Sequence, residues 1–205
     1  MNSKAKPFIK WVGGKGQLIE QLEMKLPADF DNWDDATYIE PFVGGGAMLF
    51  YMLQKHPNIK RAVINDINSD LITCYRTVRD KVEELIPALQ EIQAQYYALQ
   101  DMDAKREMFM AVRQRYNEKN LDPIENTAKF FFLNRTCFNG LYRVNKKGLF
   151  NVPCGKYMQP QICDEDTLRA DSNLLKRVEI LEGDFENTLN YAQGETLFYF
   201  DPPYR

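Results

Sequence analysis

The sequence has little of what metal sites, disulfide frameworks and membrane spans are built from. It contains a single histidine, His56, and its four cysteines show no CxxC spacing. No apolar run reaches the ~18 residues of a membrane helix, and the first residues lack the apolar core of a signal peptide. We therefore expect no metal site, no disulfides, no contact with a membrane, and a cytoplasmic protein with reduced thiols.

Acidic residues are absent from one long stretch of an otherwise acidic chain. The 205 residues carry a net charge of −3, which by itself argues against nucleic acid. Residues 129–160, however, contain six basic residues and no acid, whereas the remainder holds 20 basic and 29 acidic residues. Such a block is a local footprint for phosphate groups; the alternative is a solvated charged surface. The six residues are Lys129, Arg135, Arg143, Lys146, Lys147 and Lys156.

A glycine turn follows the first predicted strand. Residues 38–42 read as a short strand, residues 44–46 are all glycine, and residues 47–53 have a helical pattern. This order begins a nucleotide-binding βαβ unit. Gly44, Gly45 and Gly46 let the backbone approach a cofactor closely, and Glu40 could meet a cationic group. GxGxxG is absent, so a dinucleotide is not indicated.

Two further strands end in acids. Residues 61–66 form a predicted strand that ends in Asp66, 20 residues after Gly46. From this position a carboxylate accepts hydrogen bonds from ribose hydroxyls; the alternative is a cap or turn residue. The predicted strand 178–182 is followed by Asp184, which lies over the same sheet edge and could contact the adenine of a cofactor.

The N-terminal stretch has glycines beside a tryptophan. Gly13 and Gly14 permit tight turns, and Lys15 begins a helical pattern that ends at Pro27. This is not a P-loop, because the first glycine and the Ser/Thr of that motif are missing. Trp11 either belongs to the core or covers a ligand.

The middle of the chain is helical and ends in a basic hairpin. Residues 81–136 show helical periodicity throughout, with Pro123 starting the last helix. Two short β-like runs, 141–144 and 149–152, flank the turn 145–148. A basic hairpin suits the DNA major groove, where arginine pairs with guanine and an apolar side chain touches the thymine methyl. We expect three parts: residues 1–80, an inserted domain at 81–160, and residues 161–205.

The last stretch delivers an acid and two prolines after an apolar run, residues 197–200. Because proline cannot continue a sheet ladder, and the residue before it avoids the helical region, we expect Asp201 at the carboxyl end of a buried strand. Ligands of open α/β sheets bind at that edge. A strand merely stopped by proline is the alternative.

Seven stretches in this order resemble the Dam-type DNA adenine-N6 methyltransferases, of the D12 class and alpha group. They are Lys10-Trp11-x-Gly13-Gly14-Lys15, Glu40-Pro41-Phe42-Val43-Gly44-Gly45-Gly46, Asn65-Asp66-Ile67-Asn68, Phe138-Asn139-Gly140-Leu141-Tyr142-Arg143, Phe150-Asn151-Val152-Pro153-x-Gly155, Gly183-Asp184-Phe185 and Asp201-Pro202-Pro203-Tyr204. The resemblance implies an α/β, Rossmann-like class I methyltransferase sheet, with an inserted helical and β-hairpin DNA-recognition domain. It implies S-adenosylmethionine as the methyl donor and double-stranded DNA as the substrate, typically at GATC.

The resemblance also assigns roles by position. The cofactor pocket would contain Trp11, Lys15, the glycines 44–46, Asp66 and Asp201, in addition to Glu40 and Asp184. The DNA-contacting residues would be Lys10, Asn139, Leu141, Arg143, Asn145, Lys146 and Lys147. A cognate restriction endonuclease is a possible partner, and the oligomeric state stays open.

The final motif fits the chemistry of an amino group. The lone pair of adenine N6 is delocalised into the ring, so this nitrogen is a poor nucleophile. Asp201 and the Pro202 carbonyl can accept hydrogen bonds from its hydrogens and free the lone pair for in-line displacement. Tyr204 would stack on the base, which must leave the duplex. An acid rather than serine favours adenine over cytosine N4.

Members of the resembled family continue for several tens of residues beyond this motif. The Asp201 strand would then lie at an open, hydrophobic sheet edge, and we expect a fragment, a truncated chain or a degenerate product. One alternative is a catalytically incompetent DNA-binding fragment. Another is a methyltransferase acting on RNA or protein, favoured if Arg143→Ala changes neither DNA binding nor sequence preference.

Overall fold

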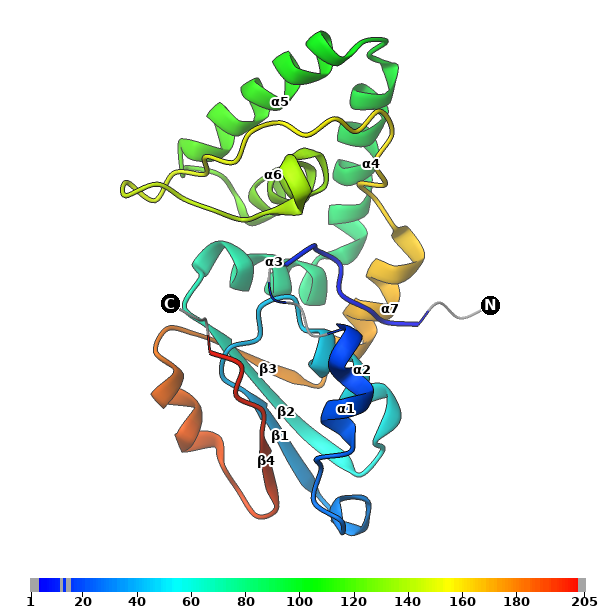
Figure 1. Ribbon diagram of the computed structural model, residues 1–205, viewed down its shortest axis with the longest axis vertical. Coiled ribbons are helices and arrows are strands. Elements are labelled where there is room, and N and C mark those ends of the chain that lie inside the picture. Colours follow the sequence, from blue (N-terminus) through cyan, green and yellow to red (C-terminus); the bar gives the residue numbers. More distant parts are fainter. Residues whose placement is uncertain (1–3, 12, 14–15, 203–205) are drawn as a thin grey trace.

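The computed structural model describes residues 4–11, 13 and 16–202. They form a lower part built on a sheet and an upper part of helices, with the N-terminal segment running between the two (Figure 1). Residues 165–202 return to the lower part after the chain has passed through the helices. The two parts therefore share one continuous boundary, along which the N-terminal segment lies.

The sheet has four parallel strands in the order β3-β2-β1-β4. They are β1 (Ala36–Glu40), β2 (Ile59–Asp66), β3 (Val178–Glu182) and β4 (Thr196–Phe198). All five residues of β1 are buried, as parallel strands covered on both faces require. Since the strands are parallel, Glu40 and Asp66 end them at one common edge.

The strand before Asp201 is not the buried strand that the sequence predicts. β4 ends at Phe198, three residues before Asp201, and its residues are only half-buried. Within the described residues β4 pairs with β1 alone, so it is an edge strand. Phe200 is 51% exposed and stacks on Phe198 at a centroid distance of 5.5 Å. Among the described residues, the strand before Asp201 thus lies at the edge of the sheet, as expected from the sequence.

Helices cover the sheet unequally (Figure 1). One side carries α1 (Ile19–Glu23), α2 (Ala47–Lys55), α3 (Ser69–Asp80) and α7 (Glu165–Leu175), and the other carries the 3-10 helix η4 (Phe185–Tyr191). Asn68 caps α3 by accepting from Leu71 N at 3.1 Å. The short 3-10 helices η1 (Gly16–Leu18) and η2 (Phe30–Asn32) flank α1.

The helix predicted to run from Lys15 to Pro27 is shorter than expected. α1 ends at Glu23, and the next amides, Lys25 N and Leu26 N, bond to carbonyls only three residues back. The residue before a proline is disfavoured in the helical region, which explains the tightened turn before Pro27. Lys15 itself lies outside the described residues.

The upper part consists of three helices, and the last of them lies at the centre of the packing. α4 (Val82–Ala98), α5 (Met102–Asn117) and α6 (Pro123–Thr136) follow one another, and α6 contacts α3, α4 and α5. Figure 1 shows α6 nearly end-on at the centre of this group. Residues 130–134 are all buried because neighbours surround the helix. Asp122 caps α6, and Pro123 opens it as predicted.

The predicted basic hairpin forms without regular strands. A single antiparallel bridge joins Val144 to Phe150, and Asn145 N donates to Leu149 O at 2.9 Å. An isolated two-stranded ribbon is marginal in water, so side chains hold the turn instead. The Asn145 carboxamide accepts from Lys147 N and Leu149 N at 2.9 and 3.1 Å. Before it, the 3-10 helix η3 (Phe138–Gly140) has Asn139 at φ 55°.

Within the described part of the chain, all four cysteines are free thiols. The same residues contain no cluster of His, Cys, Asp or Glu that could hold a metal ion. No helix among them has the length and apolar character to cross a membrane.

Candidate cofactor and DNA site

A cavity of about 700 Å³ opens at the carboxyl edge of the sheet. The segments that follow β1, β2, β3 and β4 all contribute to it, as ligand sites at this edge of α/β sheets do. Every described residue predicted for the cofactor lines it: Trp11, Glu40, Gly44, Gly45, Gly46, Asp66, Asp184 and Asp201. Pro202 lines it as well, whereas Lys15 and Tyr204 lie outside the described residues.

The lining of this cavity is acidic. It includes four acidic side chains, those of Glu40, Asp66, Asp184 and Asp201, and none of the described lining residues is basic. Like charges in a partly desolvated space raise one another's energy. A ligand that carries positive charge would relieve this repulsion, so the cavity suits a cationic ligand.

Glu40 is the deepest of the four acids. Its side chain is 3% exposed, and Tyr38 Oη donates to its Oε2 at 2.9 Å. The pKa of Glu40 is raised to about 8, chiefly by burial and also by the nearby Asp201, while the hydrogen bond from Tyr38 opposes the rise. A buried acid with neutral partners gains most from a positive charge placed beside it.

Asp66 is fixed by the backbone around it. Its Oδ2 accepts from Gly44 N at 3.1 Å and its Oδ1 from Asn68 N at 3.0 Å. Burial raises the pKa of Asp66, while these amide donors oppose the rise. Each carboxylate oxygen keeps further acceptor capacity, so the group is oriented before any ligand arrives. Asp66 also joins the end of β2 to the glycine turn after β1.

The structure shows why residues 44 and 46 of the turn are glycine, a reason that the sequence did not reveal. Gly44 and Gly46 adopt positive φ values of 49° and 72°. A Cβ on Gly44 would lie 2.8 Å from Trp11 Cδ1, and one on Gly46 would lie 2.5 Å from Tyr75 Oη. The packing of the protein itself therefore requires glycine at these two positions. The indole of Trp11 already packs on this turn.

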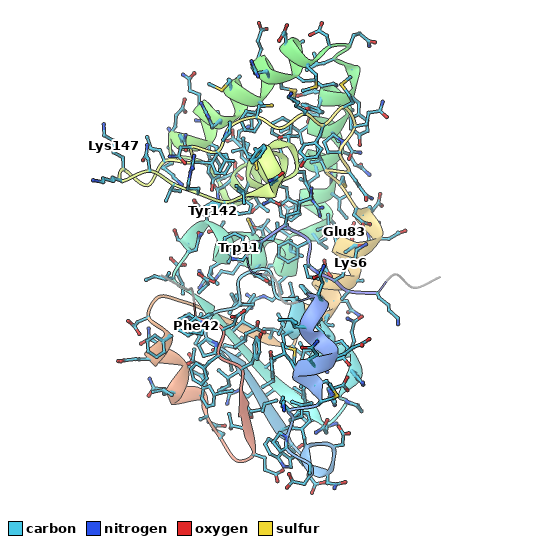
Figure 2. All side chains as sticks on the ribbon, in the orientation of Figure 1. Lys6, Trp11, Phe42, Glu83, Tyr142 and Lys147 are labelled. Atoms are coloured by element: carbon cyan, nitrogen blue, oxygen red, sulfur yellow. The ribbon has the colours of Figure 1, made fainter. Side chains whose placement is uncertain are left out.

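Trp11 connects the cavity with the upper part of the molecule. It is half-buried and stacks on Tyr142 with ring centroids 5.4 Å apart. Figure 2 labels both residues near the boundary between the upper and lower parts. Tyr142 Oη in turn donates to Asp70 Oδ2 at 3.0 Å. Trp11 thus packs against the core, and its role as a ligand cover stays a prediction. One face packs on protein and the side chain also lines the cavity.

Asp184 has a structural partner in addition to its place in the cavity. It is exposed, and its Oδ1 accepts from Glu186 N at 2.9 Å, which caps η4. The residues that sequence reasoning missed are largely apolar. Phe42 and Phe185 face each other at 5.3 Å, and Ile67 is 82% exposed. Each stands one or two residues after an acid of a strand end or turn, a signal that could have found them.

The residues predicted to read DNA gather on the segment 139–147. Asn139, Arg143, Asn145, Lys146 and Lys147 are exposed, and Leu141 is half-buried. Figure 2 shows Lys147 at the far tip of the hairpin, away from the helices. Arg143 is held by one neighbour: its Nε donates to Asn151 Oδ1 at 2.8 Å and its Nη2 to Asn151 O at 3.3 Å. The other edge of the guanidinium remains for a ligand.

Fewer of the basic residues in 129–160 are available to a ligand than the sequence predicts. Lys129 pairs with Glu125 at 3.4 Å on the surface of α6. Arg135 donates to Phe8 O at 2.8 Å, and burial lowers its pKa. Lys10, from outside the block, is exposed and lies over the Tyr157 ring at 5.1 Å. Packing therefore withdraws two of the six cations and leaves Arg143, Lys146, Lys147 and Lys156 exposed.

Fold and cavity together define an α/β protein with an acidic cavity at the carboxyl edge of its sheet and a basic hairpin. Comparison with known proteins makes the class specific. Residues 11–205 match the family described as D12 class N6 adenine-specific DNA methyltransferase. The chain belongs to this family.

Curated relatives agree with the family. The chain is 48% identical, over 98% of its length, to the type II methyltransferase M.MjaIII of Methanocaldococcus jannaschii. It is 37% identical over 97% to the type II methyltransferase M1.LlaDCHI of Lactococcus lactis subsp. cremoris. It is 34% identical over 98% to the DNA adenine methylase of Haemophilus influenzae. It spans 70%, 66% and 64% of these three proteins, respectively.

The family also bears on the expected activity and methyl donor. Its members are enzymes, adenine-specific DNA methyltransferases that use S-adenosylmethionine as the methyl donor. The parallel α/β sheet agrees with the class I methyltransferase fold expected from the sequence.

Proposed function

We propose that this chain transfers a methyl group from S-adenosylmethionine to N6 of adenine in duplex DNA at GATC. The observation that carries the proposal is the acidic cavity at the carboxyl edge of the sheet, beside Asp201 and Pro202. Family membership gives the reaction. Within this proposal, residues 81–160 act as the DNA-recognition domain and the remaining residues as the catalytic domain.

The residues of the cavity fit S-adenosylmethionine. When bound, this donor supplies a methyl group on a positively charged sulfonium. Asp66 would accept hydrogen bonds from the ribose hydroxyls, and Asp184 would contact the adenine of the cofactor. Glu40 would balance positive charge on the amino-acid side, because its buried carboxylate has only neutral hydrogen-bond donors among its described partners. Trp11, packed on the glycine turn, would cover the donor.

Asp201 and Pro202 would hold the reacting amino group. A carboxylate and a carbonyl are both acceptors, so together they can bind the two N6 hydrogens and leave the nitrogen lone pair directed at the methyl group. Positioning then supplies most of the rate enhancement, since no enzyme nucleophile is needed. Tyr204 would stack on the flipped adenine.

The hairpin supports the DNA half of the proposal. Arg143 is pre-oriented by Asn151, so its free edge can pair with guanine with less loss of side-chain freedom. Leu141 would contact the thymine methyl, and Asn139 and Asn145 would contact DNA nearby. Lys10, Lys146 and Lys147 would contact phosphates.

Partners and compartment follow from the substrate. Two of the relatives are named type II methyltransferases, which supports a cognate restriction endonuclease as a partner. An enzyme acting on cellular DNA, with four free thiols among the described residues, fits the cytoplasm.

Methyl transfer is tested with the 205-residue chain, labelled S-adenosylmethionine and two duplexes that differ only in GATC against GTAC. We expect label in N6-methyladenine of the GATC duplex alone. Asp201→Asn, which keeps the size but removes the charge, should reduce transfer by roughly 10²-fold or more. Asp166→Asn, on the exposed start of α7, is the matched control and should leave transfer unchanged.

Each other outcome has a definite meaning. No transfer to any adenine-containing duplex contradicts the activity. Salt-dependent DNA binding without transfer would support the alternative of a catalytically incompetent DNA-binding fragment. Equal transfer to both duplexes would contradict GATC specificity alone. Transfer to RNA but not to DNA would assign the chain a different substrate.

A further inference from the structure

Two cysteines are paired at the two ends of residues 138–153, the segment that carries most of the predicted DNA contacts and is called the DNA-reading segment below. An antiparallel bridge joins Cys137, directly after α6, to Cys154. Phe138 N donates to Pro153 O at 2.9 Å and Gly155 N to Thr136 O at 2.8 Å. These hydrogen bonds flank the cysteines rather than joining them. Cys137 and Cys154 therefore form the non-hydrogen-bonded pair of the bridge.

This kind of pair has the backbone spacing of a disulfide. Opposite residues of a non-hydrogen-bonded pair have Cα atoms about 4.5 Å apart, and their side chains leave the same face. Disulfides span Cα separations of roughly 4.4–6.8 Å. The backbone therefore needs little movement for the sulfurs to meet. Cys74 lies on α3, and no bridge described by the structure joins it to Cys163.

The two thiols differ in access. Cys154 is half-exposed, and although burial raises its pKa, the guanidinium groups of Arg106 and Arg113 lower it. Cys137 is fully buried, and burial raises its pKa to about 11. Its Sγ donates to Leu141 O at 3.3 Å. An oxidant therefore meets Cys154 first, and Cys137 is placed to react second.

We propose that Cys137 and Cys154 form an oxidation site, which a thiol-oxidising azo compound or small disulfide closes into a cross-strand disulfide. With an azo compound, the Cys154 thiolate adds to one nitrogen of the N=N bond. The Cys137 thiolate then attacks the Cys154 sulfur, and the S–N bond breaks. The two thiols lose two electrons and two protons, and the azo compound leaves as the hydrazine.

The bond would tie the base of the DNA-reading segment. Residues 138–153 would become a closed loop, which contains all the predicted DNA-contacting residues other than Lys10. Because the bond forms across an existing bridge, it holds the segment in its present shape. It also removes the thiol donor from Leu141 O. In a reducing compartment the thiols stay open, so closure reports oxidative conditions.

The test uses the reduced 205-residue chain, the azo oxidant diamide under native conditions, and N-ethylmaleimide added after unfolding to label the thiols that remain. Peptide mass spectrometry should find Cys137 joined to Cys154 with the loss of two hydrogens, and Cys74 and Cys163 labelled. Since the thiolate is the reactive form, the rate of linking should rise by up to about tenfold between pH 7 and pH 8.

Variants separate this site from general oxidation. Cys154→Ser should abolish the link, whereas Cys163→Ser should leave it intact. A link to Cys74 or Cys163, a link only between chains, or four labelled thiols after oxidation would overturn the proposal. So would the same mixture of links from native and urea-unfolded chain. The readout is independent of methyl transfer and DNA binding, so it stands apart from the proposed function.

Discussion

At the scale of single residues, burial makes the charged form of the cavity acids Glu40 and Asp66 unfavourable. Glu40 is buried against Tyr38 and near Asp201, and its pKa is raised to about 8. The folded chain thus holds a proton that the unfolded chain releases at lower pH. The contribution of Glu40 to stability is fully present below its ordinary pKa and is lost as the pH rises through the folded value.

We expect the ligand-free chain to become less stable between pH 5 and pH 8. One such group contributes at most about 1.4 kcal/mol per pH unit, and a domain of this size loses roughly 2–4 °C of melting temperature per kcal/mol. Glu40→Gln keeps an acceptor for Tyr38 and removes the titration. Its melting temperature should therefore fall less steeply with pH, as measured by calorimetry.

Asp171 must be separated from this effect. It is buried, accepts from Lys6 N at 2.9 Å, and burial likewise raises its pKa to about 8. Asp171→Asn should flatten the same pH window, and the double variant should flatten it further. A Glu40→Gln variant with the wild-type slope would show that Glu40 is charged in the folded protein.

At the scale of elements, two helix asparagines hydrogen-bond to the backbone of irregular segments. Asn117, at the end of α5, accepts from Phe150 N at 2.8 Å and donates to Phe150 O at 3.0 Å. Asn134 on α6 pairs in the same way with Lys10 N and Lys10 O, both at 2.8 Å. Two helices thus hold the segments that carry the predicted DNA contacts and the cavity-lining Trp11.

We expect Asn117→Ala to loosen the returning limb of the hairpin. It leaves both backbone groups of Phe150 without their partner, at a cost of about 1–3 kcal/mol. Amide hydrogen exchange at Phe150 and Asn151 should accelerate, while β1 and β2 keep their protection. DNA binding should weaken because Asn151 orients Arg143.

The control for this change lies on the same helix. Gln114 is exposed. Gln114→Ala therefore removes a side chain from α5 but keeps the hydrogen bonds between Asn117 and Phe150. Unchanged exchange at Phe150 in Asn117→Ala would mean that other contacts, such as Arg113 Nη1 to Val152 O at 3.3 Å, hold the limb by themselves.

At the scale of the whole molecule, acidic and basic groups are gathered in different places. The cavity is acidic and the hairpin tip is basic, although the net charge is only −3. In the proposed complex the phosphates of DNA would be attracted to the hairpin, while the acidic cavity receives the flipped adenine. The approach should depend on salt through the few cations that packing leaves exposed.

The salt dependence of DNA binding should identify these cations. Each phosphate contact contributes about 0.9 to the slope of log K against log salt concentration. Lys146→Gln with Lys147→Gln should reduce the slope by up to about 1.8. Lys129→Gln should leave it nearly unchanged, because Lys129 is paired with Glu125. The slopes are measured by fluorescence anisotropy. If Lys129→Gln lowered the slope as much as the double change, Lys129 would also contact phosphates.

Local chemistry explains how much the sequence by itself determined. Strand ends, the glycine turn and the helix start at Pro123 depend on residues close together in the chain, so periodicity and turn chemistry predict them. The acids at the strand ends fall at one edge because parallel strands share it. Their meeting in one cavity therefore followed from the order of elements.

Long-range packing decided the rest. Only the tertiary structure shows that Arg135 bonds to Phe8, that Trp11 lies between the glycine turn and Tyr142, and that β4 ends three residues before Asp201. Burial, hydrogen-bond partners and proton affinity depend on neighbours that are distant in sequence, and no local pattern encodes them. For the same reason Cys137 and Cys154, 17 positions apart, read as unrelated residues until the bridge paired them.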